Sequence, residues 1–379
     1  EKTITRPARA EYCGIRGEAN VKYRVGIIGA TGMVGQRFVS ILAEHPWFDV
    51  TVLAASSRSA GQTYIEAVGG RWAFEWPVPE GVREMVVQDA ALVDQLAAQV
   101  DFVFCAVDMP KDQIRALETA YAKTETPVVS NNSAFRMTDD VPMMIPEINA
   151  GHVAVIEAQR KRLGTKVGFV TCKPNCSIQG YVPALEPLKD FGLEKVMVAT
   201  YQAISGAGKT FRTWPEMTDN VIPYIGGEEQ KSEQEPLKIW GSVVDGRIVP
   251  ASKPLISAQC IRVPVTDGHM AAVSVSFARK PSREEILARW ASYEGLPQKY
   301  QLPSAPEKFL TYFEEDNRPQ TRLDRDLFGG MGIAIGRLRE DVLMDYKFVS
   351  LSHNTLRGAA GGAVLTAELL VHEGWIVRK

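Results

Sequence analysis

The first third of the chain alternates between short apolar runs and stretches with apolar residues at three- and four-residue spacing. The runs are rich in β-branched and aromatic residues, as in buried strands, and lie at residues 23–28, 50–53, 101–107 and 127–130. Helical spacing follows at residues 34–42 and 111–122. Strands that alternate with helices pair in parallel, so this part of the chain predicts an α/β domain with a doubly wound parallel sheet.

Beyond about residue 190 the pattern changes. Strand-like runs follow one another with few helices between them, at residues 196–204, 256–263, 270–277, 331–338 and 341–351. Strands adjacent in sequence favour antiparallel pairing, so we expect an α+β domain with a largely antiparallel sheet. Helices are expected at residues 281–295 and 358–373. A length of 379 residues also exceeds one typical core and favours two domains.

The composition is ordinary for a soluble globular protein, with 45% hydrophobic residues, 23% charged residues and a formal net charge of -2. This charge argues against nucleic-acid binding, and no apolar run approaches the ~18 residues that span a bilayer. The five cysteines are scattered and odd in number, which favours a reducing, cytoplasmic compartment over a disulfide framework. Residues 1–21 have mixed charges and no apolar core, so we interpret them as an N-terminal extension and not a secretory signal.

A glycine-rich segment, Gly-Ala-Thr-Gly-Met-Val-Gly at residues 29–35, joins the first predicted strand to the first predicted helix. This context is typical of a Rossmann-type dinucleotide-binding unit. Gly29 allows the tight turn, Gly32 lets a pyrophosphate approach the backbone, and Gly35 lets helix and strand pack closely. The pyrophosphate would lie at the helix N-terminus. Glycines alone are a weak signal, because any tight strand–helix turn can use them.

The end of the second strand indicates which dinucleotide is bound. An NAD site usually has an acidic residue here for the ribose 2′-hydroxyl. This chain has Ser56, Ser57 and Arg58 instead, which suit a 2′-phosphate and favour NADP. The alternative is a solvated serine-rich loop. Residues 131–136 follow the strand at 127–130, at the sheet edge where such folds bind ligands.

Cys176 lies in the segment 173–177, between an apolar run at 166–172 and a helical pattern formed by Ile178, Tyr181, Val182, Leu185 and Leu188. A thiol near the first turn of a helix faces unpaired N–H groups and the positive end of the dipole, which lower its pKa. The alternative is an inert buried cysteine. Pro183 and Pro187 suggest that this helix is short or kinked.

Five motifs occur in a specific order along the chain. They are the glycine loop, Pro-Asn-Cys-Ser at 174–177, Tyr-Gln-Ala-Ile-Ser-Gly-Ala-Gly at 201–208, Ile-Arg-Val-Pro-Val-Thr-Asp-Gly-His at 261–269 and His-Asn-Thr-Leu-Arg-Gly-Ala-Ala-Gly-Gly at 353–362. From about residue 22 to its end, the sequence closely resembles the aspartate-β-semialdehyde dehydrogenases, and more the archaeal and fungal branch than the commoner bacterial one.

The resemblance implies an NADP-dependent, phosphorylating aldehyde dehydrogenase. Enzymes of this family reduce 4-phospho-L-aspartate with NADPH to L-aspartate 4-semialdehyde through a cysteine thioester and release phosphate, in the biosynthesis of lysine, methionine, threonine and isoleucine. The resemblance also implies a glyceraldehyde-3-phosphate dehydrogenase-like C-terminal domain and a homodimer or dimer of dimers. We therefore expect an NADP-binding domain at residues 22–174, completed by a C-terminal helix at 355–379, and a catalytic and dimerisation domain at 175–354.

Residue by residue, the resemblance assigns the nucleophile to Cys176, the acid/base to His269 and the orientation of the acyl group to Gln202. Arg262 would bind the substrate α-carboxylate, Glu235 and Lys238 its ammonium and phosphate, and Arg136 and Asn175 would complete the phosphate site. We expect cofactor contacts from Gly29, Thr31, Gly32, Met33, Val34, Ser56, Ser57, Arg58, Ser205, Gly206, Asn354 and Thr355.

The residue types suit this substrate independently, since its ammonium needs a carboxylate and its two anionic groups need cations. An arginine holds a carboxylate by two parallel hydrogen bonds, which a lysine cannot do. Two of the assignments have plain structural alternatives. A histidine on a strand is often structural, and Glu235 and Lys238 alone would be a solvated helical ion pair, although Pro236 between them is a poor helix former.

Two other functions remain open at this point. An acyl-CoA reductase, specifically malonyl-CoA reductase, would use the same cysteine and NADPH but has no amino group or acyl phosphate to bind. Asn175 and the pair Glu235 and Arg262 favour the amino-acid substrate over it. A non-catalytic NADP-binding sensor would keep the glycine loop without a reason to keep Cys176, Gln202, Arg262 and His269 together.

Overall fold

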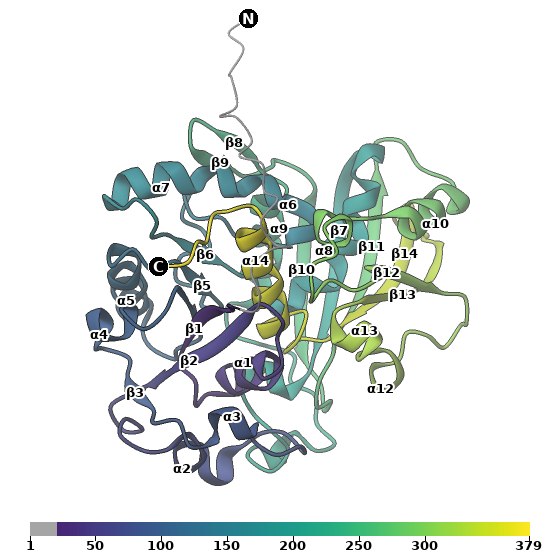
Figure 1. The fold of residues 1–379 in the computed structure, drawn as a ribbon. Coiled ribbons are helices and arrows are strands. Elements are labelled where there is room, and N and C mark those ends of the chain that lie inside the picture. Colours follow the sequence, from purple (N-terminus) through teal and green to yellow (C-terminus); the bar gives the residue numbers. More distant parts are fainter. Residues whose placement is uncertain (1–20) are drawn as a thin grey trace, which may run out of the picture.

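The computed structural model describes residues 21–379, so the predicted N-terminal extension lies, except for Val21, outside the described residues, as does Cys13. Two six-stranded sheets lie side by side, the first at the left and the second at the right of Figure 1. Among the described residues, no helix is both long and apolar enough to cross a membrane.

The first sheet is parallel throughout and has the order β3-β2-β1-β4-β5-β6. Its strands are β1 (Tyr23–Ile28), β2 (Phe48–Ala55), β3 (Gln88–Asp89), β4 (Phe102–Cys105), β5 (Val128–Ser130) and β6 (Val170–Cys172). The intervening helices are α1 (Met33–Leu42), α2 (Tyr64–Val68), α3 (Glu80–Arg83), α4 (Val93–Ala97), α5 (Lys111–Lys123), α6 (Pro146–Asn149) and α7 (Ile156–Leu163). The predicted Rossmann-type sheet is thus confirmed, and its order reverses between β1 and β4, where such sheets bind ligands.

The second sheet is mixed and has the order β10-β7-β11-β14-β13-β12. Its strands are β7 (Leu193–Gln202), β10 (Leu255–Arg262), β11 (His269–Phe277), β12 (Leu310–Phe313), β13 (Ile333–Glu340) and β14 (Tyr346–Ser352), and β8 (Ser242–Val244) and β9 (Arg247–Val249) form a separate hairpin. The central strands pair antiparallel as predicted, whereas β10 joins β7 and β12 joins β13 in parallel. The predicted α+β second domain is confirmed, although β8, β9 and β12 were not predicted.

The helices of the second half are α8 (Tyr181–Leu185), α9 (Glu228–Ile239), α10 (Arg283–Ser292), α11 (Leu296–Lys299), α12 (Thr321–Asp324), α13 (Leu327–Gly330) and α14 (Ala360–His372). The helix predicted after Cys176 is in fact a 3₁₀ helix (Cys176–Gln179), α8 and a second 3₁₀ helix (Glu186–Phe191). Pro183 and Pro187 remove two backbone donors from this segment, which confirms the prediction that the helix is short or kinked.

The last helix, α14, belongs by packing to the first sheet. It is buried along nearly its whole length and packs against α1, β5 and α6. Near its N-terminus, Arg357 forms a buried bidentate ion pair with Glu147 of α6, with N–O distances of 2.8 and 3.0 Å. This packing agrees with a C-terminal helix that completes the first domain, while the domain boundaries given above stay predictions.

Candidate active site

Four strand ends meet at the site. β7 and β10 are parallel, with Gln202 opposite Arg262 in the register, so both residues stand at the same edge of the second sheet. β11 runs antiparallel to β7, and its first residue, His269, therefore lies at that edge too. Cys176 follows β6, the last strand of the first sheet. The topology thus brings residues nearly 100 positions apart in sequence to one place.

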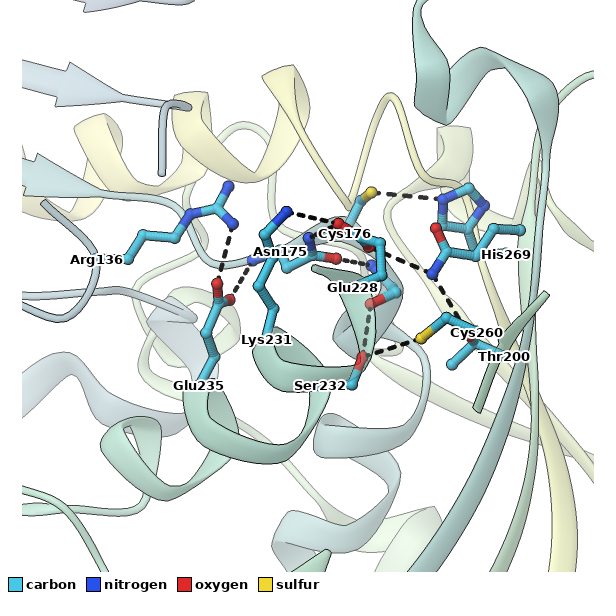
Figure 2. A network of polar contacts seen from close by, with 12 residues as sticks. Arg136, Asn175, Cys176, Thr200, Glu228, Lys231, Ser232, Glu235, Cys260 and His269 are labelled. Carbon is cyan, nitrogen blue, oxygen red and sulfur yellow. Dashed lines mark hydrogen bonds and ion pairs between the residues drawn. The ribbon is translucent and has the colours of Figure 1, made fainter. Parts of the chain in front are cut away.

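The turn that carries Cys176 is fixed by Asn175. Its side-chain oxygen accepts from the Ser177 N–H at 2.7 Å and caps the 3₁₀ helix, and its Nδ2 donates to Glu228 at 3.0 Å. Cys176 is only partly exposed, and its sulfur points toward the ring of His269, 3.4 Å from Nε2 (Figure 2).

The expectation of a lowered Cys176 pKa is wrong for the free protein. Burial raises the pKa of this thiol to about 11, against the opposing effect of Arg136, Arg262 and Lys173. The 3₁₀ helix is only four residues long, so its dipole is weak, whereas desolvation acts on the whole side chain. Burial and the nearby Arg262 lower the pKa of His269 to about 3. Thiol and imidazole are therefore both neutral.

Arg262 is buried beside this pair and donates from Nη1 to the Ala203 carbonyl at 2.6 Å. Gly206 covers both side chains. A Cβ at position 206 would lie 3.0 Å from Arg262 Nη1 and 3.0 Å from His269 Nε2, so only glycine fits without displacing them. The predicted cofactor residue Gly206 therefore adjoins the predicted catalytic histidine.

One face of α9 lies against the Cys176 turn and carries four charged side chains: Glu228, Lys231, Glu235 and Lys238. The helix continues through Pro236, whose missing N–H leaves the Ser232 carbonyl without its helical partner. The buried hydroxyl of Tyr181 donates to that carbonyl at 2.6 Å instead.

Glu228 is a site residue that the sequence analysis missed. Its carboxylate accepts from Asn175 Nδ2 at 3.0 Å, from Gln202 Nε2 at 3.3 Å and from Lys231 Nζ at 2.7 Å (Figure 2). Glu228 is also the acidic group that raises the Cys176 pKa most. The sequence held one signal for it, because Glu228 and Lys231 repeat the three-residue spacing of Glu235 and Lys238 seven positions earlier.

Glu235 and Lys238 are buried, and both side chains already form hydrogen bonds within the protein. Glu235 accepts from Arg136 Nη1 at 3.0 Å and from the Asn175 N–H at 2.6 Å. Lys238 Nζ donates to the carbonyls of Arg136, Thr138 and Val141 at 2.6–2.8 Å, which uses all three of its protons.

The substrate contacts of Lys238 and Glu235 stay predictions, and both side chains already have partners within the site. Lys238 has no donor left for a phosphate, and burial lowers its pKa to about 8. Both Glu235 oxygens are taken by groups of the site itself. Arg136, by contrast, keeps its buried Nε without a hydrogen-bond partner among the described residues.

The glycine loop has the geometry expected of a dinucleotide site. Gly29 has φ +93°, and a Cβ there would lie 2.2 Å from the Ala106 carbonyl oxygen at the end of β4. A Cβ on Gly35 would lie 2.1 Å from the Gly29 oxygen, whereas at Gly32 it would meet only that oxygen at 3.6 Å. Close packing thus requires Gly29 and Gly35, and the open space at Gly32 fits a ligand approaching the backbone.

The other predicted cofactor residues lie around this loop and the Gly206 turn. Thr31, Met33 and Val34 surround the start of α1, and Ser56, Ser57 and Arg58 are exposed after β2. Asn354 is buried and bridges two loops. It accepts from the Gly268 N–H at 2.8 Å and donates to Ser205 Oγ at 2.8 Å, and Thr355 is buried beside it.

Comparison with known proteins agrees with this arrangement. Residues 24–156 match the family model described as semialdehyde dehydrogenase, NAD binding domain, and residues 185–357 match that of the semialdehyde dehydrogenase dimerisation domain. An aspartate-semialdehyde dehydrogenase of Archaeoglobus fulgidus is 46% identical over 93% of this chain and 99% of that protein. The chain belongs to the aspartate-semialdehyde dehydrogenase family. An aspartate-semialdehyde dehydrogenase of Aspergillus fumigatus is 42% identical over 94% of this chain and 99% of that protein.

Solved aspartate-semialdehyde dehydrogenases have the same fold. The Candida albicans enzyme, crystallised with NADP, superposes with a TM-score of 0.83 at 38% identity and covers 94% of this chain and 100% of that chain. The archaeal and fungal relatives confirm the predicted branch. Malonyl-CoA reductase, the alternative left open by the sequence, gains no support from these relatives.

Proposed function

We propose that this member of the aspartate-semialdehyde dehydrogenase family converts 4-phospho-L-aspartate and NADPH to L-aspartate 4-semialdehyde, NADP and phosphate through a thioester on Cys176. The observation that carries the proposal is the Cys176 sulfur 3.4 Å from His269 Nε2, with a buried arginine, Arg262, and a buried carboxylate, Glu228, on either side. A substrate with an α-carboxylate and an α-ammonium needs a cation for the first group and a carboxylate for the second, and these two residues supply them. The product would serve lysine, methionine, threonine and isoleucine biosynthesis.

In this proposal Arg262 binds the α-carboxylate, and Glu228 takes the role first predicted for Glu235 and binds the α-ammonium. Arg136, with its unpartnered Nε, and Lys231 bind the phosphate. Asn175 supports the phosphate site indirectly, because its side chain holds Glu228 and caps the nucleophile turn. Gln202 lies beside Glu228 and orients the acyl group.

The coenzyme fits the residues present. The first turn of α1 has no acidic residue and no side-chain cap, which leaves its N–H groups for a pyrophosphate. Ser56, Ser57 and Arg58 would hold the 2′-phosphate. When bound, NADPH supplies the hydride for reduction of the thioester.

We also propose that the protein is a cytoplasmic enzyme. We propose further that two chains associate through their second domains to form a homodimer, or that two such dimers form a larger assembly. Support comes from the dimerisation-domain match and from exposed apolar side chains on two neighbouring strands, Met197 and Tyr201 of β7 and Leu255 of β10. Apolar side chains exposed together on a sheet face are typical of subunit interfaces.

The deciding experiment is a spectrophotometric assay of NADPH formation from L-aspartate 4-semialdehyde, NADP and phosphate, with malonyl-CoA reduction as the control. We expect phosphate-dependent turnover and no malonyl-CoA activity. Cys176→Ser should abolish turnover while NADPH still binds, since a serine hydroxyl has almost no anionic fraction near neutral pH. Retention of a tenth of the activity by that variant would contradict a covalent mechanism.

A further inference from the structure

We propose that Glu118, held as a neutral carboxylic acid, is a positioning residue of the phosphate site and fixes the turn that leads from β5 to Arg136. The inference rests on the phosphate-binding role proposed above for Arg136. It explains how residues 131–136, which follow β5 at the ligand-binding edge of the first sheet, are held in one conformation.

A single carboxyl oxygen closes the turn after β5. Glu118 lies on α5 and is fully buried, and its Oε1 accepts from Ser130 Oγ at 2.5 Å and from Asn132 Nδ2 at 2.8 Å. The Asn132 backbone N–H in turn donates to Ser130 Oγ at 3.0 Å. Two side chains and one peptide group of the turn are therefore tied to Glu118, either directly or through the Ser130 hydroxyl.

Arg136 depends on the same turn for its position. Its Nη2 donates to the carbonyl of Asn131, the residue between the two that Glu118 holds, at 3.1 Å. Its Nη1 donates to Glu235 of α9 at 3.0 Å (Figure 2). The guanidinium group is thus fixed from two sides, and a shift of the Asn131 carbonyl would move the group that is proposed to bind phosphate.

The strand before the turn is fixed independently of Glu118. Ser130 pairs with Cys172 in the β5–β6 ladder, and its carbonyl accepts from the Lys173 N–H at 2.7 Å. These backbone contacts would remain if the side chain of Glu118 lost its hydrogen bonds. Such a loss would therefore free the turn and Arg136, while the segment that leads to Cys176 would stay in place.

The surroundings of Glu118 favour the neutral acid. Among residues 21–379 its side chain contacts no cation, and its Oε2 is buried without a hydrogen-bond partner. The titratable groups that face it are the thiols of Cys105 on β4 and Cys172 on β6, and burial raises the pKa of both, so they are neutral as well. Burial also raises the pKa of Glu118, against the effect of its hydrogen bonds. An ionised carboxylate here would be a buried charge without a counter-ion, whereas the acid keeps its acceptor at Oε1.

Kinetics of three variants separate this positioning role from a structural one. Glu118→Gln keeps the acceptor and the shape of the neutral acid, Glu118→Leu removes the acceptor, and the double variant Ser130→Ala/Asn132→Ala removes the donors of the turn. We expect the last two to raise the phosphate KM about tenfold at a kcat within about threefold of the wild type, because Arg136 moves and Cys176 does not. Glu118→Gln should keep the phosphate KM within about threefold of the wild type.

Asp112→Asn is the matched control, since Asp112 lies in the first turn of the same helix and is exposed. An unchanged phosphate KM in the folded double variant would refute the positioning role, even if Glu118→Leu does not fold. A phosphate KM for Glu118→Gln as high as that of the double variant would show that the ionised form is needed, and would refute the neutral acid.

The protonation state can also be measured without turnover. Infrared spectroscopy detects the C=O stretch of a protonated carboxyl group, and the difference between the wild-type protein and Glu118→Gln isolates the band of Glu118. We expect this band at pH 7, well above the ordinary glutamate pKa of about 4.3. Its absence would refute the neutral acid whether or not the protein has the proposed activity. Absence of phosphate-dependent turnover in the wild type, by contrast, would contradict the proposed function.

Discussion

Glu235 joins the proposed phosphate-binding arginine to the nucleophile turn through a single carboxylate. One oxygen accepts from Arg136 Nη1 at 3.0 Å and the other from the backbone N–H of Asn175, the residue before Cys176, at 2.6 Å (Figure 2). Glu235→Gln keeps the shape of the side chain but replaces one acceptor by an NH₂ group. Both partners are donors, so the amide must face one of them with another donor.

The structure sets the size of the effect. Glu235 is buried, and a hydrogen bond to a charged group contributes about 1.5–3 kcal/mol. Leaving Arg136 without its buried counter-ion adds a desolvation penalty, so we expect a loss of stability of about 3 kcal/mol. Misplacement of Arg136 by about 1 Å should cost about 10²-fold in kcat/KM, mainly through a raised KM for phosphate.

The assay is steady-state oxidation of aspartate semialdehyde at varied phosphate, combined with thermal unfolding of the same preparations. Glu233→Gln is the matched control, since Glu233 lies on the same helix and its carboxylate accepts from the Ala258 N–H at 3.1 Å, away from the Cys176 turn. A phosphate KM for Glu235→Gln within threefold of the control, at equal thermal stability, would refute the positioning role.

Four further predictions test other parts of the site. Arg262→Lys keeps the charge but loses the two parallel hydrogen bonds, so kcat/KM should fall by about two to three powers of ten; a loss under threefold at unchanged KM would remove Arg262 from the substrate site. Arg58→Ala should weaken NADPH binding far more than NADH binding by titration calorimetry, and equal losses would place Arg58 outside the 2′-phosphate site. Because burial raises the Cys176 pKa to about 11, its alkylation rate in free enzyme should climb about tenfold per pH unit from pH 7 to 10, and a plateau near pH 7 would contradict that shift. Sedimentation at micromolar protein should give a multiple of the 41.8 kDa chain mass, and a value near 41.8 kDa would exclude the dimer.

The fold could be predicted from the sequence because its signals are local. Apolar runs alternating with helical spacing identified β1, β2, β4 and β5, and β1 matches the predicted residues 23–28 in full. Short edge strands have no such signal: β12 has only four residues, and pairing with β13 defines it more than its own pattern does. The strand predicted from residue 341 begins only at Tyr346, after a bend in the chain.

The candidate site was predicted less well where burial determines the pKa or the contacts of a side chain. Local context predicted a low pKa for Cys176, but desolvation by distant parts of the chain raises it. The spacing of Glu235 and Lys238 is the same as that of Glu228 and Lys231, and nothing local shows which pair faces the sulfur. The two pairs differ in their position along α9, where about two helical turns separate them. Only Glu228, in the first pair, contacts Gln202 and the Asn175 side chain.

The second pair of α9 has a physical reason for its burial. The turn that carries Cys176 lies between the two domains, so its position must be fixed relative to both. Helix α9 of the second domain contributes the side chains that fix it. Lys238 donates to three carbonyls of the segment that follows β5, while Glu235 accepts from Arg136 of that segment and from the backbone N–H of Asn175. A charged pair in this place can make five directed hydrogen bonds, where apolar side chains of equal volume would make none. The pair that resembled a solvated surface feature in the sequence, Glu235 and Lys238, therefore orders the groups around the sulfur.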